Sequence, residues 1–487
     1  MIGPHRLPCE TPEAHRPATT EATVTEATVN RFVLPVTILG SSLSFIDGSV
    51  VNVALPAIGQ ELRADLATIQ WVVNGYMLTL ASLILIGGAA GDVFGRRRIF
   101  MIGLVGFTLA SIACGLAPRP SWLIAARLIQ GAAAALLVPA SLAIIGSAYT
   151  GAARGPAVGT WAAAAALTTA LGPVLGGWLV DTVGWRAIFF INVPLAAVAL
   201  VLAFKLPADR GLGKDQKLDW TGALCAIAAL GLLSYGLIAL GEGDRGVGIA
   251  AIAASLPAAL LFIRTELRAA APMMPLSLFR NRSFAGANAL TLFVYAALTA
   301  SLFMLPLTLI NAHGYTAAQA GAAFLPFSAI MGAGSRFAGR LVEQIGARVP
   351  LIAGPALTAA GYALLGWSGD DPTFWRAVLP GLMVVGVGMT IGATPLTTVV
   401  LDSAPDDQSG IVSGINNAMA RAAGLIAVAA LGLAFGGAGM SSLESGALIP
   451  AYRLVMFVAA GLALLGALTA AATIGGREPG EAGAIGK

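Results

Sequence analysis

The stretch Gly87-Gly88-Ala89-Ala90-Gly91-Asp92-Val93-Phe94-Gly95-Arg96-Arg97-Arg98 decides how this chain folds. It separates two long apolar runs, so its charges lie where a membrane-spanning helix would turn back. Far downstream, Gly339-x-Leu341-x-Glu343-x-x-Gly346-x-Arg348 follows the spacing of Gly88-x-Ala90-x-Asp92-x-x-Gly95-x-Arg97. An ordinary basic loop would explain the three arginines but not this shared spacing. The same turn motif occurs once in each half of a hydrophobic chain, which predicts a transporter built from an internal repeat.

The composition indicates that the solvent of this protein is largely lipid. The chain has 487 residues, of which 57% are hydrophobic and 11% charged, and its mean hydropathy is +0.83. Soluble proteins carry about 25% charged residues. The net charge of +4 is too small to indicate a nucleic-acid partner. We therefore expect an integral membrane protein whose surroundings are the lipid bilayer.

Motifs of enzymes and cofactor sites are absent from the sequence. The stretch Gly211-Leu212-Gly213-Lys214-Asp215 departs from a phosphate-binding loop at two positions. Three histidines and three cysteines show no spacing typical of a metal site or a disulfide framework. We expect no enzymatic activity, no metal and no cofactor, and we do not expect transport powered by nucleotide hydrolysis within this chain.

Fourteen apolar runs are long enough to cross a bilayer, which takes about 20 residues. They are 31–56, 69–90, 99–117, 121–145, 157–180, 187–205, 220–240, 247–263, 285–311, 317–335, 349–368, 374–400, 410–435 and 451–474, of which 247–263 is the weakest. The runs at 220–240 and 247–263 interrupt the repeat, with six runs on either side. The expected fold is all-α, with two six-helix bundles and two inserted membrane helices.

The expected domain boundaries follow from these runs. The polar residues 1–30 predict a disordered cytoplasmic tail without a cleaved signal peptide. An N-terminal bundle (31–205), a linker with the inserted helices (206–284), a C-terminal bundle (285–474) and a second tail (475–487) follow. With the N-terminus inside, inner connections hold fifteen basic residues and outer ones six. This bias places both termini in the cytoplasm and the protein in the cell membrane.

Asp47 is the one carboxylate that lies deep inside an apolar run. Burying a charge there costs about 2.5–3.5 kcal/mol on insertion scales, so we expect it to take up and release a proton during transport. A structural acid paired with a base or a helix end is the alternative. At a rise of 1.5 Å per residue, the depths of Asp47 and Arg127 below the outer ends of their helices differ by about 4 Å. A long arginine side chain can span that difference. Arg127 could instead extend to the outer interface.

Several of these motifs resemble one known family. The opening stretch looks like the signature loop of the major facilitator superfamily. The context of Asp47, residues 46–56, resembles the first-span motif of its fourteen-span drug–proton antiporters, with Ser49 in place of the usual threonine. Leu123-x-x-x-Arg127-x-x-Gln130-Gly131 is similar to the superfamily's fourth-span motif, which implies that Arg127 tunes the proton site.

Further matches point to the antiport branches of that superfamily. Gly172-Pro173-Val174-Leu175-Gly176-Gly177 resembles their fifth-span motif, although Thr168 replaces a further glycine. The resemblance implies a kinked, tightly packed seal near the outer end, while ordinary glycine packing is the alternative. The strings 70–76 and 184–194 are similar to the fourteen-span drug exporters in particular.

The resemblance implies the major facilitator fold and export of small, largely apolar drugs or antibiotics in exchange for protons, by a monomer. An exporter of an endogenous metabolite or lipid, a symporter, and a membrane receptor or scaffold that transports nothing are the alternatives. The expected cytoplasmic gate consists of Gly88, Asp92, Gly95, Arg97, Gly339, Glu343, Gly346 and Arg348. Candidate residues of the substrate cavity are Asn52, Tyr76, Gln130, Tyr295, Phe324, Asn416 and Asn417, although those of the second half could equally pack between helices.

Overall fold

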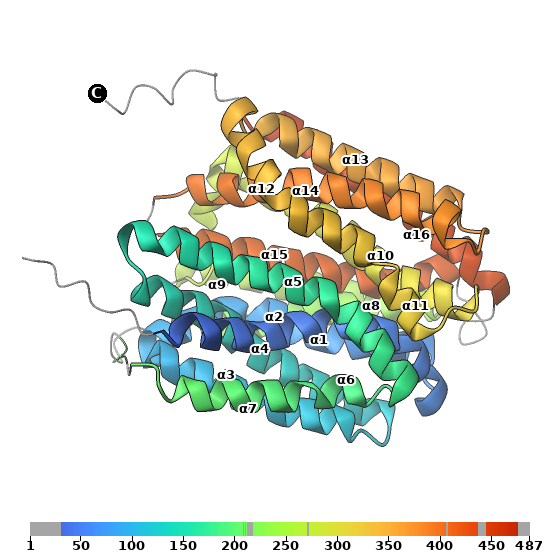
Figure 1. The fold of residues 1–487 in the computed structure, drawn as a ribbon, viewed down its shortest axis with the longest axis horizontal. Helices are drawn as coiled ribbons and strands as arrows, with labels where there is room; N and C mark the ends of the chain where they lie inside the picture. Colours follow the sequence, from blue (N-terminus) through green and yellow to red (C-terminus); the bar gives the residue numbers. More distant parts are fainter. Residues whose placement is uncertain are drawn as a thin grey trace, which may run out of the picture.

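A computed structural model describes residues 31–207, 209, 211, 218–269, 272–405, 408–436 and 445–475. The first predicted tail (1–30), all of the second (475–487) except Gly475, and the acidic residues Asp406 and Asp407 lie outside these residues. Within them the chain is helical, without strands, as predicted (Figure 1).

The first half contains five long helices and one interrupted helix. Their bounds are α1 (Val33–Leu62), α2 (Leu66–Phe94), α3 (Arg96–Gly115), α4 (Pro120–Ala148), the short η1 (Gly151–Ala153), α5 (Arg154–Thr182), α6 (Ala187–Phe190) and α7 (Asn192–Ala203). The inserted pair follows as α8 (Trp220–Gly241) and α9 (Arg245–Arg268). The apolar run predicted as weakest therefore lies in a helix of 24 residues.

The second half repeats this order. Its elements are η2 (Leu276–Arg280), α10 (Arg282–Asn311), α11 (Ala317–Ala322), α12 (Leu325–Ile345), α13 (Arg348–Trp367), η3 (Phe374–Val378), α14 (Leu379–Asp402), α15 (Ser409–Ala430), η5 (Leu431–Phe435) and α16 (Ser445–Thr473).

In the described residues, twelve helices are long and apolar enough to cross a membrane. The other two predicted runs, 187–205 and 317–335, coincide with interrupted helices, α6–α7 and α11–α12. Pro194 has no N–H to offer the carbonyl four residues earlier, which weakens the helix where α6 gives way to α7. The count of fourteen spans stays a prediction.

The packing of the helices shows the internal repeat. In the first half α2 and α3 pack on α4, α1 packs on α5, and α7 packs on α1 and α3. In the second half α12 and α13 pack on α14, α10 packs on α15, and α16 packs on α10 and α13. The two halves meet through equivalent pairs, α2 with α15 and α5 with α11, and α8 of the inserted pair lies against α2 and α15.

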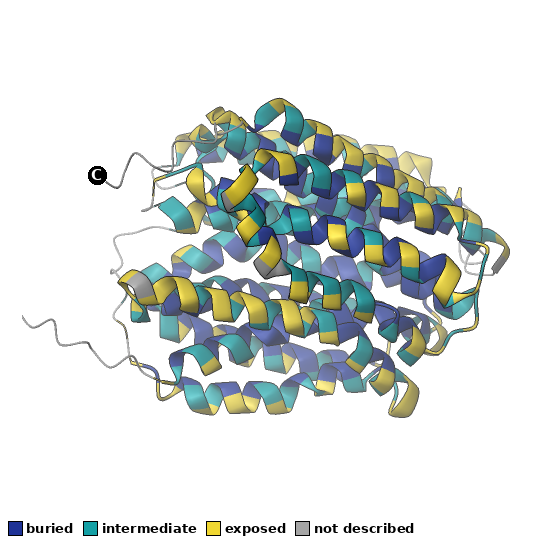
Figure 2. Ribbon diagram, turned by 45° about the horizontal axis from the view of Figure 1, so that its top comes forward, coloured by how far each residue is buried: buried dark blue, intermediate teal, exposed yellow. Residues whose placement is uncertain are grey.

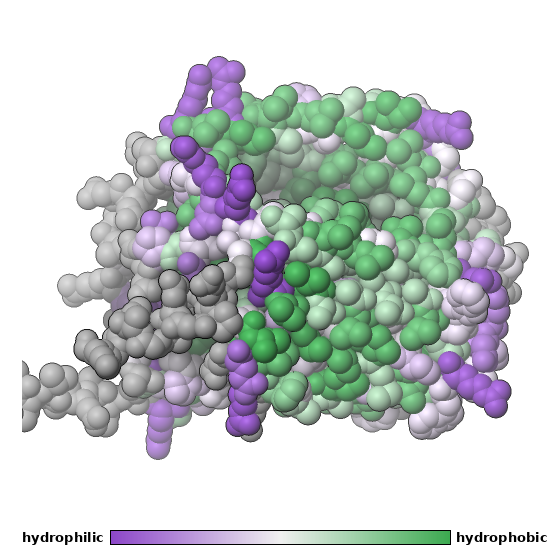
Figure 3. All heavy atoms as spheres, turned by 90° about the horizontal axis from the view of Figure 1, so that it is seen from above, coloured by the Kyte–Doolittle hydropathy of each residue, from purple (hydrophilic) through white to green (hydrophobic). Residues whose placement is uncertain are grey.

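The outward faces of the helices are apolar, as a lipid environment requires. Figure 2 shows buried residues on the inner faces of the helices and exposed residues on the outer faces, and Figure 3 shows a hydrophobic surface with most hydrophilic side chains toward its two ends. Within the most apolar 18-residue window of each helix, 78% of the residues are buried in α1 but only 17% in α9. The helix carrying Asp47 is therefore central, and α9 is peripheral.

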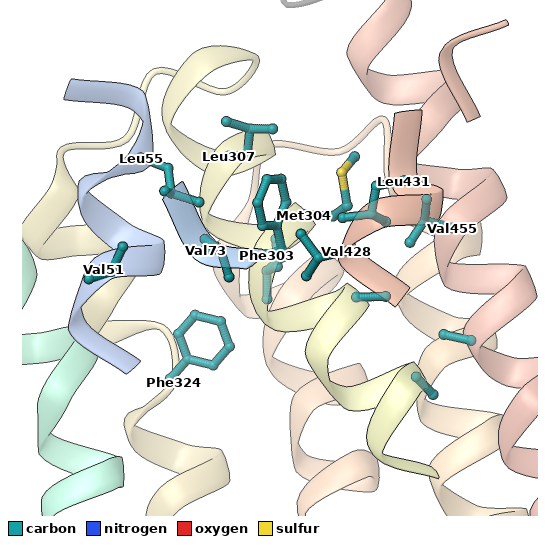
Figure 4. Close-up of a cluster of buried hydrophobic side chains, with 14 of the residues drawn as sticks. Val51, Leu55, Val73, Phe303, Met304, Leu307, Phe324, Val428, Leu431 and Val455 are labelled. Carbon is teal, nitrogen blue, oxygen red and sulfur yellow. The ribbon is translucent and has the colours of Figure 1, made fainter. Parts of the chain in front are cut away.

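We name the end at which α2 gives way to α3 the basic end, and the opposite end the far end. Near the far end one hydrophobic cluster joins the two halves (Figure 4). Val51 and Leu55 of α1 lie there with Phe303 and Leu307 of α10, and Phe324 lies close to Val51.

Candidate functional site: a buried carboxylate–arginine pair

Asp47 and Arg127 form an ion pair in the interior of the first half. The Nη1 of Arg127 donates to Oδ2 of Asp47, and neither residue is more than 1% exposed. Gln130, one turn after Arg127 on α4, joins both, because its Nε2 donates to Asp47 Oδ1 at 2.9 Å and its Oε1 accepts from Arg127 Nη1 at 2.8 Å. Arg127 is thus directed at the carboxylate and not at the outer interface.

The neighbouring helix α2 orients the arginine. The Nε of Arg127 donates to the carbonyl of Val72 at 3.1 Å, and its guanidinium lies 4.3 Å from the centre of the Tyr76 ring. The hydroxyl of Tyr76 forms a 2.7 Å hydrogen bond with Ser44 on α1. Tyr76 is therefore a wall of the Asp47 site, where a face of its ring meets the arginine's positive charge.

Two residues that sequence reasoning did not single out complete the site. Asn192 on α7 is fully buried beside the Asp47 carboxylate, and its Nδ2 donates to Ser111 Oγ on α3 at 3.0 Å. Its Oδ1 has no partner in the described part of the chain. Asn192 belongs to the apolar string 184–194, so a buried amide in that run was the signal that could have identified it.

This arrangement suits reversible protonation. A buried ion pair is stable only while both charges are present, because loss of one leaves the other uncompensated in a medium of low polarity. A proton arriving at Asp47 would release Arg127 to its remaining acceptors, Gln130 and the Val72 carbonyl. The described residues hold no cluster of His, Cys, Asp and Glu able to bind a metal.

The glycines of the fifth-span motif lie at two helix crossings. A Cβ added to Gly172 would lie 1.9 Å from Ser49 Oγ, and one on Gly176 would lie 2.3 Å from Val50 Cγ2, so both glycines face α1. A Cβ on Gly177 would lie 2.2 Å from the Ala317 carbonyl oxygen of α11. Pro173 lies at the same crossing, where a Cβ on Gly321 would come within 2.1 Å of its carbonyl oxygen. The motif thus joins α5 to α1 and to the second half.

The far end is closed by the crossing of α5 with α11 and by polar contacts between helices. Asp181 at the end of α5 accepts from the backbone N–H groups of Ala317 and Ala318 at 3.1 and 2.8 Å. Across α2 and α15, Gln70 Nε2 donates to the carbonyl of Val428 at 2.5 Å. Toward the basic end, by contrast, a Cβ on Gly159 of α5 or Gly339 of α12 would meet no atom within 4 Å. α5 and α12 diverge toward that end (Figure 1).

The turn between α2 and α3 is built around Gly95, whose φ of +96° suits glycine. Gly88 lies about two turns earlier, against Pro139 of α4. Asp92 pairs with Arg96, at 2.9 Å, and not with Arg97. Asp209, in the connection after α7, caps α3 by accepting from the N–H groups of Arg96 and Arg97 at 2.6 and 3.1 Å. The motif gave no signal for Asp209, because it lies more than a hundred residues away.

The downstream copy of the turn has the same geometry. Gly346, with φ of +73°, ends α12 as Gly95 ends α2. Arg348 donates to the carbonyl of Ala471 near the end of α16 at 3.1 Å, and Arg97 donates to the carbonyl of Phe204 at the end of α7 at 3.0 Å. The equivalent arginines therefore tie equivalent helix ends. The side chain of Glu343 lies outside the described part of the chain.

The candidate cavity residues fall into two groups. Phe324 is buried in the contact between the halves, and Asn52 is buried on α1. Asn416 donates to Thr291 Oγ1 of α10 at 2.7 Å, Asn417 donates to the Ser413 carbonyl at 3.2 Å, and Tyr295 borders a pocket between α10, α13 and α14. The structure does not bring these residues together with Gln130 and Tyr76 into one enclosed site.

One charged residue in the middle of a span was overlooked in the sequence. Arg421 lies within the apolar run 410–435, and its charge acts electrostatically on Tyr76 and Tyr295. The rule that identified Asp47, a charge deep in an apolar run, would have found it.

Comparison with known proteins supplies the family. A sequence model described as the Major Facilitator Superfamily matches residues 37–429. The chain belongs to the Major Facilitator Superfamily. It is therefore a multi-pass membrane transporter and not an enzyme, as the sequence predicted.

The relatives of this transporter include drug and antibiotic resistance proteins. It is 37% identical over 400 residues to the multidrug resistance protein Stp of Mycobacterium tuberculosis (strain CDC 1551 / Oshkosh), covering 81% of this chain and 74% of that protein. It is 36% identical over 427 residues to the methylenomycin A resistance protein of Bacillus subtilis (strain 168), covering 85% and 91%. A solved structure of a D-xylose–proton symporter has the same fold, with a TM-score of 0.65, 14% identity, and coverage of 91% of this chain and 98% of that one.

Proposed function

We propose that this transporter exports small, largely apolar drugs or antibiotics from the cell in exchange for protons, by alternating access. The observation that carries the proposal is the ion pair between Asp47 and Arg127, buried in the middle of a membrane bundle. Intramembrane carboxylates are costly and typically mark proton or substrate pathways. The substrate class, drugs and antibiotics, is taken from the relatives, which are named as a multidrug resistance protein and a methylenomycin A resistance protein.

The proposed orientation places the basic end and both termini in the cytoplasm, with no second copy of the chain required. In that orientation the closed far end faces outward, and the conformation is open to the cytoplasm. A compound would enter from that side while Asp47 is deprotonated and paired with Arg127. After the change of state, a proton from outside would neutralise Asp47, weaken the pair and accompany the return of the empty transporter.

The experiment uses inside-out membrane vesicles in which respiration acidifies the interior. Adding a transported compound should partly discharge the pH gradient, as recorded by a pH-sensitive dye, in vesicles holding the wild-type chain but not in vesicles without it. Uptake of the compound with no change in the gradient would overturn proton exchange while leaving transport intact. If no compound from a broad antibiotic panel is moved, drug export itself is wrong.

A further inference from the structure

Arg421 occupies the middle of α15, twelve residues from its start at Ser409, which is about 18 Å along the helix axis. Its direction follows from the next turn, where a Cβ on Gly424 would lie 3.3 Å from Met77 Sδ of α2 and 2.9 Å from Thr299 Oγ1 of α10. Arg421 acts electrostatically on Tyr76 of α2 and Tyr295 of α10. The guanidinium therefore lies half-buried where α15 meets α2 of the first half and α10 of the second.

No counter-charge meets this arginine within the described residues. Arg421 takes part in none of their salt bridges or hydrogen bonds. The carboxylate on the other side of Tyr76, Asp47, is already held by Arg127 and Gln130. An arginine cannot lose its proton inside a protein, and intramembrane charges almost always have partners or face a water-filled cavity.

We propose that Arg421 binds an anionic group of the transported compound, a carboxylate or a phenolate on an otherwise apolar, aromatic molecule. This inference rests on the proposed export function and narrows its substrate class. The planar guanidinium offers a fork of N–H donors that fits a carboxylate. Asn417, one turn earlier on the same face of α15, is also half-buried and adds an amide to the site.

The neighbouring surface suits the apolar part of such a compound. Beside Tyr295 lies a small pocket with a cavity volume of about 10 Å³, lined by Leu290, Val294, Pro355, Met389 and Leu396 among others. Drug-sized ligands occupy about 300–1,000 Å³, so the pocket must widen before it takes even one ring of such a molecule. The charged end of the molecule would then remain between the two halves, where it reaches Arg421.

An anionic substrate would also change the energetics of exchange. An anion leaving the cell and a proton entering it both move positive charge inward, so the membrane potential would drive export together with the pH gradient. The ring of Tyr76 contacts Arg127 of the Asp47 pair, and Tyr76 also lies within electrostatic range of Arg421. An anion bound at Arg421 and a proton bound at Asp47 would therefore influence each other through neighbouring charges.

The test compares two dyes that share a xanthene skeleton, the anion fluorescein and the cation rhodamine 123, bound to purified full-length protein in nanodiscs. By fluorescence anisotropy, the wild type should bind fluorescein at least tenfold more tightly than rhodamine 123. Arg421→Gln should weaken fluorescein binding by about ten- to a hundredfold, the usual loss for a charged hydrogen bond. Arg421→Lys keeps the charge but loses the fork of donors, so it should bind fluorescein more weakly than the wild type and more tightly than Arg421→Gln. Arg264→Gln, on the exposed face of α9, should bind fluorescein as tightly as the wild type.

Three results would overturn the inference: equal binding of the two dyes by the wild type, fluorescein binding by Arg421→Gln as tight as wild type, or loss of binding of both dyes together in Arg421→Gln. The comparison of dyes needs no variant, so it decides the matter even if Arg421→Gln fails to fold. Transport in vesicles separates this inference from the function. Tight fluorescein binding without export would contradict the function alone, and export of rhodamine 123 but not fluorescein would contradict the anion site alone.

Discussion

At the scale of single residues, the proposed proton coupling depends on Asp47. Asp47→Asn removes the charge but keeps the volume and hydrogen-bonding capacity of the side chain, so the protein should still insert and fold. We expect proton-driven accumulation of compound in vesicles to fall to the level of vesicles without the transporter, while exchange between equal pH values on both sides persists. Full gradient-driven accumulation by this variant would show that the proton binds elsewhere.

Arg127 offers a second test of the same site, because a positive neighbour favours the charged form of a carboxylate. Arg127→Ala should let Asp47 keep its proton at higher pH, and the pH profile of transport should move upward. Arg127→Lys retains the charge and should move the profile less. If a folded, active Arg127→Ala variant shows the wild-type profile, the ion pair is structural only.

The sequence predicted the two members of this pair but not the network around them. A charge in an apolar run is visible by position alone, which is how Asp47 and Arg127 were found. The amide of Asn192 comes from α7, and its approach to Asp47 depends on how α7 packs against α1 and α3, a tertiary contact that no spacing reports. Arg421 was visible in principle by the same rule as Asp47 and was missed.

At the scale of elements, the crossing of α5 and α11 depends on glycine at position 177. Gly177→Ala would place a methyl group 2.2 Å from the Ala317 carbonyl oxygen, so the two backbones must separate. We expect a lower melting temperature and a far end that opens more often, measured by the labelling rate of a cysteine introduced at that crossing. Gly159→Ala in the same helix meets no atom within 4 Å and gains about 1 kcal/mol of helix propensity, so it is the matched control. Equal behaviour of the two variants would show that the crossing is loose.

The cap that Asp209 gives to α3 is a separate prediction at this scale. Asp209→Ala leaves the N–H groups of Arg96 and Arg97 without their acceptor, a loss of about 1 kcal/mol for a helix cap. Hydrogen exchange of these two amides should accelerate about fivefold. Asp209→Asn keeps only one of the two acceptor oxygens, so one of the two amides should exchange as slowly as in the wild type and the other faster. Unchanged exchange in the alanine variant would mean that water replaces the cap at no cost.

The sequence also showed its strengths and limits at this scale. Among the described residues, hydropathy located the twelve helices that are long and apolar enough to cross a membrane. The glycine spacing located both turns, because Gly95 and Gly346 have the positive φ that the repeated motif requires. The interruptions between α6 and α7 and between α11 and α12 were not predicted, since run length and hydropathy do not register a local break in helix hydrogen bonding.

At the scale of the whole molecule, transport requires the closed end and the open end to exchange roles. The far end is closed by contacts of α5 with α11 and of α2 with α15, while α5 and α12 diverge toward the basic end. In this conformation Asp92 is occupied by Arg96, and a Cβ on Gly410 near the start of α15 would meet no atom within 4 Å. Space therefore remains beside Gly410 for an acidic partner when the basic end closes.

Asp92 is the proposed partner, because a helix N-terminus carries about half a positive charge and an anion there contributes about 0.3–1 kcal/mol when exposed and up to about 2 when partly buried. Asp92→Asn would weaken this contact in the closed form of the basic end. A difference of about 1.4 kcal/mol shifts a two-state population tenfold, which is enough to slow turnover without impairing folding. Spin labels on the basic ends of α2 and α15 should show the short-distance population of the wild type reduced about tenfold in Asp92→Asn, with unchanged expression. Arg96→Gln, which removes the partner of Asp92 in the present conformation, should shift the same population the opposite way. If Asp92→Asn abolishes transport while its distance distribution matches wild type, Asp92 acts on some step other than closure of the basic end.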